Sequence, residues 1–167
     1  AIKQANQFRI VQSGQKLAGM LVFLTDVHSM GLDIAQGLQF TTAFVWNQDE
    51  ETKAWSNRFN ERHGAMPTMV QAGVYSAVTN YLKAVKEAGT DDTETVRAKL
   101  GEMTLNDMFV TGGKIAPNGS MLHDMYLVEV KKPSESKSEW DLLNVVSKIP
   151  ADQAYISMAD TKCSLVN

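Results

Sequence analysis

The sequence GAMPTMVQAGVYSAVTNYLKAVKEAG, residues 64–89, carries the strongest helix signal in the chain. Apolar side chains recur every three or four residues, which is the period of a helix that buries one face. Gly89 suits the left-handed residue that ends a helix, and Pro67 suits a first helical turn. These signals predict one long helix with a buried apolar stripe at Val70, Val74, Val78, Tyr81, Val85 and Ala88.

Upstream of this helix the pattern alternates between helices and strands. Residues 1–12 are predicted to be the last part of a helix. The apolar run LAGMLVFL at 17–24 is predicted to be a strand buried on both faces. Residues 25–31 are expected to form a loop, and a short helix is expected at 32–36. A second strand at 38–45 alternates apolar and polar residues, so we expect it to be less buried than the first.

Two further helices have recognisable capping residues. Asp49 is a good N-cap for a helix that runs to about His63 and stops at Gly64. Asp91, with Glu94 three residues on, resembles a capping box and predicts another helix that continues to about residue 100.

The last third of the chain changes to hairpin signals. The sequence Pro-Asn-Gly at 117–119 predicts a turn, and residues 125–130 and 140–146 predict two strands of a hairpin. The intervening run KKPSESKS, residues 131–138, is expected to be a solvated loop. The order of elements predicts an α/β fold with a parallel sheet and an appended antiparallel hairpin.

Length and composition exclude several classes of protein. The 167 residues allow one domain or pieces of two, and the net charge of −3 gives no argument for nucleic-acid binding. No apolar run approaches the roughly 20 residues that span a bilayer. Because the chain opens in helical register with neither an N-cap nor an initiator Met, we expect it to be a fragment of a longer precursor.

No catalytic or cofactor motif is present. The glycine-rich nucleotide loops and the common hydrolase, zinc-protease and Cys-x-x-Cys patterns are absent. No two residues can be assigned acid and base roles, and the single cysteine, Cys163, gives no case for a nucleophile. The spacing Asp26-x-His28 alone is too few ligands for a metal. We therefore expect no enzyme activity, no metal and no cofactor.

Several residues are candidates for contacting a small ligand. Asp26 and His28 follow the first predicted strand, where they can bind a cationic group and a carboxylate or hydroxyl; alternatively Asp26 caps the short helix and His28 is solvated. Trp46, at the end of the second predicted strand, either walls an apolar pocket or packs on the next helix. The start of the long helix offers Met69, Gln71 and Tyr75; for Met69 and Tyr75, core packing is the alternative.

Three stretches together point to a family. The sequences GLDIAQGLQFTTAFVWNQDEET, HGAMPTMVQAGVYSAVTNYLKAVKEAGTDD and GSMLHDMYLVEVKKPSESKSEWD occur in this order along the chain. In order and spacing they resemble the C-terminal half of type I periplasmic solute-binding proteins. The resemblance is greatest to the leucine/isoleucine/valine-binding group of ABC transporter substrate-binding proteins.

The resemblance implies two Rossmann-like, three-layer αβα lobes that close over a solute held between them. By order of elements, residues 1–43 correspond to part of the second lobe, residues 44–123 to part of the first, and residues 124–167 to a return to the second. The family protein is about twice as long as this chain, and the serine and threonine residues that usually grip the solute carboxylate fall in the remaining half.

The family's ligand contacts can be carried over to this chain by position. They usually come from the loop after a second-lobe strand, here 25–29, and from a first-lobe helix start, here 69–75. With Trp46 added, the predicted solute contacts are Thr25, Asp26, His28, Trp46, Met69, Gln71 and Tyr75. The aromatic members of this set, with Met69, suit a flat or aromatic solute.

The implied function is solute capture for import. A periplasmic protein of this kind binds an amino acid or an aromatic or carboxylic acid and delivers it to the permease subunits of an ABC transporter, without catalysis or a cofactor. The alternative is a ligand-sensing receptor or regulatory domain of the same fold with no role in transport. Because a truncated lobe exposes a helix face and a sheet edge, we expect this chain alone to self-associate and to bind solute poorly.

Overall fold

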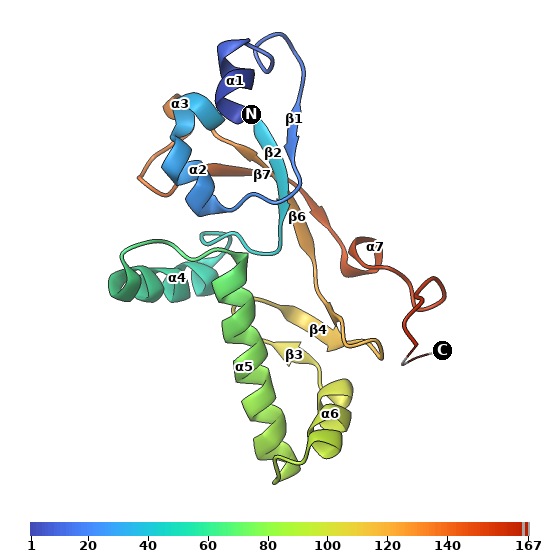
Figure 1. The fold of residues 1–167 in the computed structure, drawn as a ribbon. Coiled ribbons are helices and arrows are strands. Elements are labelled where there is room, and N and C mark those ends of the chain that lie inside the picture. Colours follow the sequence, from blue (N-terminus) through green and yellow to red (C-terminus); the bar gives the residue numbers. More distant parts are fainter. Residues whose placement is uncertain (165, 167) are drawn as a thin grey trace. The chain divides into compact units, whose positions relative to one another are not determined.

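The computed structural model describes residues 1–164 and 166. Helices and strands alternate along much of the chain (Figure 1), which confirms the predicted α/β class. In chain order the elements are α1 (Ile2–Gln7), β1 (Leu17–Gly19), α2 (Leu24–Met30), α3 (Leu32–Ala35), β2 (Leu38–Thr42), α4 (Glu50–His63), α5 (Met69–Ala88), α6 (Thr93–Glu102), β3 (Leu105–Asn106), β4 (Thr111–Ile115), β5 (Met121–Leu122), β6 (Met125–Val130), the 3₁₀ turn η1 (Pro133–Glu135), β7 (Leu143–Ile149) and α7 (Ala151–Ala154).

The described residues form two compact units, between which the chain passes three times. Unit 1 comprises residues 1–69 and 125–148, and unit 2 comprises residues 70–124 and the described residues after 148. These units are compact parts of this chain, whereas the boundaries expected after residues 43 and 123 divide the two lobes of the complete family protein. The lobe boundaries therefore stay a prediction.

The sheet of unit 1 has the strand order β1-β2-β6-β7. Strand β1 pairs with β2 in parallel, with Leu17 opposite Leu38, whereas β2 pairs with β6 antiparallel, with Phe40 opposite Val128. These pairings agree with the predicted parallel sheet and appended antiparallel element: β1 and β2 are parallel, and β6, one strand of the predicted hairpin, joins the sheet antiparallel to β2. The prediction that the last two strands lie together is confirmed, since β6 and β7 are neighbours.

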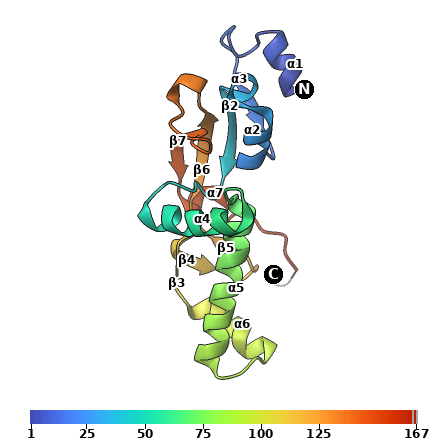
Figure 2. The same cartoon turned by 90° about the vertical axis from the view of Figure 1, so that its left-hand side faces the viewer.

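Helices α2 and α3 cover one face of this sheet (Figures 1 and 2). Their inward side chains Leu24, Val27 and Ala35 belong to one hydrophobic cluster with side chains of the two central strands. The strand residues of that cluster are Leu38 and Phe40 from β2 and Val128 and Val130 from β6, all at most 3% exposed. Strand β2 is thus fully buried on this face, and the expectation that it is the less buried strand was wrong.

The apolar run at 17–24 does not form one buried strand. Strand β1 is an edge strand that ends at Gly19, and the next two side chains, Met20 and Leu21, are 96% and 72% exposed. The predicted loop at 25–31 is also wrong, because helix α2 begins at Leu24. An edge strand with one neighbour has little to bury its outer residues, so the apolar run divides between a strand, an exposed connection and a helix.

Helix α4 follows its sequence signals closely. The Asp49 carboxylate accepts a hydrogen bond from the backbone N–H of Thr52 at 2.8 Å, and Gly64 ends the helix with a φ of 82°. Both features match the predicted N-cap and the predicted left-handed stop. The indole of Trp55 meets the ring of Phe44 edge to face, with 5.9 Å between ring centroids.

Unit 2 is built on α5, which lies beside β3 and β4, with α6 next to its C-terminal part (Figure 1). The side chains that α5 buries are small or polar: Ala72, Ser76, Asn80 and Ala84. Ser76 and Asn80 both donate hydrogen bonds of 2.7 Å to Asp107, which follows β3. The same carboxylate accepts the backbone N–H groups of Phe109 and Val110 through its other oxygen.

The predicted buried stripe of this helix is largely exposed. Val74, Val78 and Tyr81 are 59%, 52% and 45% exposed. The prediction of the helix itself and of its stop at Gly89, which has a φ of 69°, is confirmed. The burial was predicted wrongly because periodicity identifies an apolar face without identifying what covers it.

The remaining elements show smaller differences from prediction. Asp92, one residue after the predicted Asp91, caps α6 by accepting a hydrogen bond from Thr95. The predicted turn at 117–119 connects β4 and β5, where the N–H of Gly119 donates to the carbonyl of Ala116. Strand β7 begins at Leu143, so the predicted strand start at residue 140 came too early.

Candidate functional site

The first turn of α2 holds Thr25 and Asp26. Asp26 is exposed, and its Oδ2 accepts a hydrogen bond of 2.8 Å from the backbone N–H of Phe23 at the start of the helix. This is the helix-capping role weighed as the alternative to ligand contact. The bond engages one carboxylate oxygen, so Asp26 has the other oxygen available for a ligand. Thr25 is partly buried in the same turn.

One turn further along α2, His28 is held by two residues that precede β7. Its imidazole lies flat against the indole of Trp140, with 3.9 Å between ring centroids and 8° between ring planes. Its Nε2 lies 2.9 Å from Oε1 of Glu139. Because an ionised carboxylate only accepts hydrogen bonds, Nε2 carries a proton. In the neutral ring, Nδ1 is then an acceptor that can bind a hydroxyl or an ammonium group.

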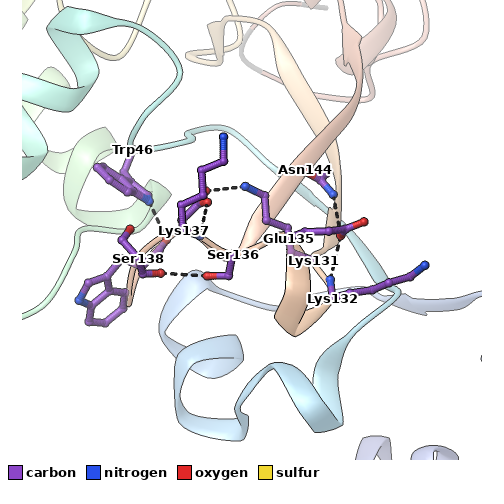
Figure 3. Close-up of polar contacts among 10 residues, drawn as sticks. Trp46, Lys131, Lys132, Glu135, Ser136, Lys137, Ser138 and Asn144 are labelled. Atoms are coloured by element: carbon purple, nitrogen blue, oxygen red, sulfur yellow. Dashed lines mark hydrogen bonds and ion pairs between the residues drawn. The ribbon is translucent and has the colours of Figure 1, made fainter.

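Trp46 is tied to the same segment. Its indole Nε1–H donates a hydrogen bond of 2.9 Å to the backbone carbonyl of Trp140 (Figure 3). Trp140, which is 8% exposed, therefore connects two predicted ligand residues, one through its ring and one through its backbone. The structure thus brings His28 and Trp46 into contact with the same buried tryptophan.

The segment between β6 and β7 is fixed by polar contacts, several of which Figure 3 shows. Lys131 and Asp141 form an ion pair of 2.5 Å whose side chains are 14% and 11% exposed. The backbone N–H of Lys137 donates to the second oxygen of Asp141. Lys131 was expected to be solvated with the rest of this run; that was wrong, because its ammonium group is needed to pair a nearly buried carboxylate.

Asp141 titrates differently from an ordinary aspartate. Burial raises the pKa of its carboxyl, but hydrogen bonds from Lys131 and Lys137 outweigh the burial, so the pKa lies below its usual value. The carboxylate stays charged at neutral pH. It therefore keeps its bonds to Lys131 and Lys137, which hold the segment between β6 and β7 next to Trp140.

Two spaces in unit 1 adjoin the predicted residues. His28 and Glu139 line an open groove of about 460 Å³ between α2–α3 and the η1 segment. That volume lies within the range of small-molecule sites, roughly 300–1,000 Å³. Trp46 and Met69 line a separate cavity of about 10 Å³, which has room for about one water molecule. Met69 also accepts the backbone N–H of Ala43 at its sulfur, 3.4 Å away.

Gln71 and Tyr75 belong to unit 2, in the first turns of α5. Both side chains are exposed. They lie four residues apart, on adjacent turns of the helix. The prediction that Gln71 and Tyr75 share one solute site with the predicted contacts of unit 1 stays a prediction.

Trp140 and Glu139 were missed by the sequence reasoning. Trp140 was read as the first residue of a strand, and Glu139 fell between the predicted loop and that strand and was assigned no role. Their signal was weak, because the contact with His28 spans more than a hundred residues of sequence. The tripeptide Glu-Trp-Asp at 139–141, a buried aromatic between two acids, was the feature that could have drawn attention to them.

Residues 1–164 and 166 show neither a metal site nor a membrane-spanning helix. Within that part of the chain, no cluster of three or more histidine, cysteine or acidic side chains has the arrangement of a metal site. No helix there has the length and apolar character required to cross a membrane.

Comparison with known proteins identifies the family. The sequence profile of a family described as periplasmic binding protein matches residues 1–137. The chain belongs to this family. No curated protein sequence gave a significant match to this periplasmic binding protein chain.

Solved structures agree with the family assignment. A periplasmic binding protein from Burkholderia mallei is 46% identical to this chain and superposes with a TM-score of 0.91. A branched-chain amino acid ABC transporter periplasmic ligand-binding protein from Burkholderia xenovorans LB400 is 40% identical, with a TM-score of 0.92. In both cases the match covers 99% of this chain and 44% of the other, so this chain spans less than half the length of those proteins. The predicted fold class, that of a type I periplasmic binding protein, is confirmed.

A more distant structure is similar in fold. It is a solute-binding protein of an ABC transporter from Rhodopseudomonas palustris BisB5, in complex with 3,4-dihydroxybenzoic acid. It is 20% identical to this chain, with a TM-score of 0.74 over 90% of the chain, and at that identity it supports the fold alone.

Proposed function

We propose that this chain contributes part of the solute-binding site of an ABC importer's periplasmic binding protein. The observation that carries the proposal is the match of nearly the whole chain to two periplasmic binding proteins at 46% and 40% identity. The complete protein captures a small organic solute outside the cytoplasm and delivers it to the membrane permease. It does so by binding and release, without catalysis.

The solute class proposed is a small organic acid, which includes amino acids and aromatic acids. His28, supported by Glu139 and Trp140, supplies a polar group backed by an aromatic ring. Trp46 adds a second indole in the same unit. One oxygen of Asp26 is engaged by the α2 backbone, so a solute ammonium group has only the other oxygen available. We propose Thr25, Met69, Gln71 and Tyr75 as the remaining contacts.

A chimera tests this proposal directly. This chain replaces the equivalent region of the Burkholderia mallei protein, and the chimera is titrated calorimetrically with leucine and with 3,4-dihydroxybenzoic acid. We expect saturable binding of at least one of them. Substituting His28→Ala should weaken that binding roughly tenfold, a change of about 1.4 kcal/mol.

The matched control is His63→Ala, in α4, whose ring contacts Phe59. It should bind as tightly as the unsubstituted chimera. Absence of binding to both probes, while the parental protein binds one of them, would overturn the proposal. Equal effects of the two histidine substitutions would overturn the assignment of His28.

We also infer that this chain alone self-associates. Both units expose apolar side chains, among them Met20 and Leu21 next to the edge strand β1 and Leu82 on α5. Unpaired sheet edges and apolar patches promote association. Light scattering at tens of micromolar should show a mass above that of the monomer, and a monomeric mass would contradict the inference.

A further inference from the structure

The loop between β4 and β5 is a tight hairpin turn that requires a glycine. The N–H of Gly119 donates a hydrogen bond of 2.8 Å to the carbonyl of Ala116, and the N–H of Ala116 donates one of 2.8 Å to the carbonyl of Ser120. Pro117 occupies the first corner of the turn, and Gly119 has a φ of 83°. A turn followed by a left-handed residue is a common three-residue hairpin loop, and glycine adopts the left-handed conformation without steric cost. The fold thus determines which residue follows Asn118.

That glycine makes the preceding asparagine chemically reactive. The backbone nitrogen of the next residue can attack Cγ of an asparagine side chain, and a side chain on that next residue hinders the attack. Gly119 has no Cβ, which permits close approach. Gly119 is exposed and Asn118 is partly exposed, so water reaches both. No other asparagine of the sequence is followed by glycine.

The turn also folds the side chain of Asn118 back over the Gly119 peptide. The N–H of Ser120 donates a hydrogen bond of 3.1 Å to Oδ1 of Asn118. Negative charge develops on this oxygen when a nucleophile adds to Cγ, and a donor at about 2.7–3.1 Å stabilises such a charge. The Ser120 N–H therefore lies where an oxyanion donor is required. The hydrogen bond from Gly119 to Ala116 opposes the reaction, because it must open before the Gly119 nitrogen can reach Cγ.

We propose that the pair Asn118–Gly119 is a site of spontaneous deamidation in the folded chain. The backbone nitrogen of Gly119 forms a bond to Cγ of Asn118 and the Cγ–Nδ2 bond breaks. The side-chain nitrogen leaves as ammonia, with the proton that the Gly119 nitrogen loses. The resulting succinimide then adds water. Addition at Cγ gives aspartate, and addition at the backbone carbonyl carbon gives isoaspartate. Water is the co-reactant, and nothing is oxidised or reduced.

The two products affect the hairpin differently. Aspartate keeps the length of the loop, and like asparagine it is a favoured turn residue. Isoaspartate adds a methylene group to the main chain of the loop. Because loop length fixes the register of a hairpin, the isoaspartyl form should lose the pairing of Ile115 with Met121. The modification therefore opens the β4–β5 hairpin, and it does not depend on the proposed solute site.

Ageing of the complete, folded chain tests the proposal. The chain is incubated at mildly alkaline pH, digested with trypsin and analysed by liquid chromatography with mass spectrometry. We expect the peptide that begins at Ile115 to acquire the mass of aspartate in place of asparagine, in separate aspartyl and isoaspartyl forms. An isoaspartate methyltransferase identifies the second form. Each conversion adds a negative charge to a chain of net charge −3, so ion exchange separates the converted protein before digestion.

Asn144 provides a control within the same sample. It is exposed on β7, but the branched side chain of Val145 hinders the next backbone nitrogen, so Asn144 should stay unconverted. The variant Asn118→Gln should abolish the new peptide forms, because the longer side chain closes a ring far more slowly. The variant Asn118→Asp carries the aspartyl product from the start and should keep the hairpin intact.

Hydrogen exchange in β4 and β5 should be faster in the isoaspartyl fraction than in unaged protein or in Asn118→Asp. Equal exchange in all three would overturn the predicted opening of the hairpin. Three results would overturn the modification site itself. Asn118 could stay intact in the folded chain while it converts in urea, Asn144 could convert as fast as Asn118, or Asn118→Gln could give the same new forms.

Discussion

The two units of this chain stabilise themselves in different ways. Unit 1 packs a sheet against α2 and α3 through a continuous apolar cluster that includes Phe40 and Val128. Unit 2 buries fewer apolar side chains and holds α5 partly by hydrogen bonds from Ser76 and Asn80 to Asp107. The comparison teaches that an amphipathic helix can be fixed through its small, polar face while its apolar face stays available for another surface.

The largest expected effect is in the core of unit 1. Phe40→Ala removes a ring that is 3% exposed, and it should lower the free energy of unfolding by about 3–5 kcal/mol. Val78→Ala on the exposed face of α5 should change it by less than about 0.5 kcal/mol. Urea denaturation measures both values. Similar losses for the two substitutions would break the distinction between a buried cluster and an exposed stripe.

In unit 2 the corresponding test removes the shared acceptor. Asp107→Ala removes the acceptor of the buried Ser76 hydroxyl and one of the acceptors of the Asn80 amide, so it should cost about 2–3 kcal/mol of unfolding free energy. Hydrogen exchange should rise along α5. The control is Asp91→Ala, at an exposed position before α6, where little change is expected. If α5 kept its protection without Asp107, apolar packing would be its main attachment after all.

The ion pair behind Trp140 gives a pH-dependent prediction. Asp141→Asn should destabilise unit 1 by about 2 kcal/mol at neutral pH, less than for a fully buried pair because both side chains keep some exposure. The folded pKa of Asp141 is lowered, so its contribution is present above the unfolded value, near 3.9, and is lost as pH falls through the folded value.

Measuring the free energy of unfolding at a series of acidic pH values separates the contribution of Asp141 from the general loss of stability in acid. The difference between the unsubstituted chain and Asp141→Asn should shrink as pH falls below about 4. A difference that stayed constant down to pH 2 would show that the lowered pKa contributes nothing to folding.

The smallest effect is expected at a helix cap, where the interaction is local. Asp49→Ala removes the acceptor for the Thr52 N–H and should cost about 1 kcal/mol. Asp49→Asn, which retains an acceptor oxygen, should recover most of that loss. Thermal unfolding followed by circular dichroism is sufficient to rank the three proteins, and equal stability of the alanine and unsubstituted forms would argue against the cap.

Local chemistry accounts for the parts of the fold that were predicted correctly. The cap at Asp49, the stop at Gly64 and the end of the long helix at Gly89 depend on backbone geometry and on hydrogen bonds within a few residues. The candidate site was less predictable. His28 was identified by its residue type, but Trp140 and Glu139 reach it only through contacts distant in sequence.

The sequence by itself determined both ends of α4, the end of α5 at Gly89, and that α5 has one apolar face. Tertiary structure decided which face of α5 is buried, how the apolar run at 17–24 is divided, and that Trp140 contacts both His28 and Trp46. The reason is physical: hydrogen bonding and capping act over a few residues, whereas burial depends on whichever distant surface the fold brings into contact.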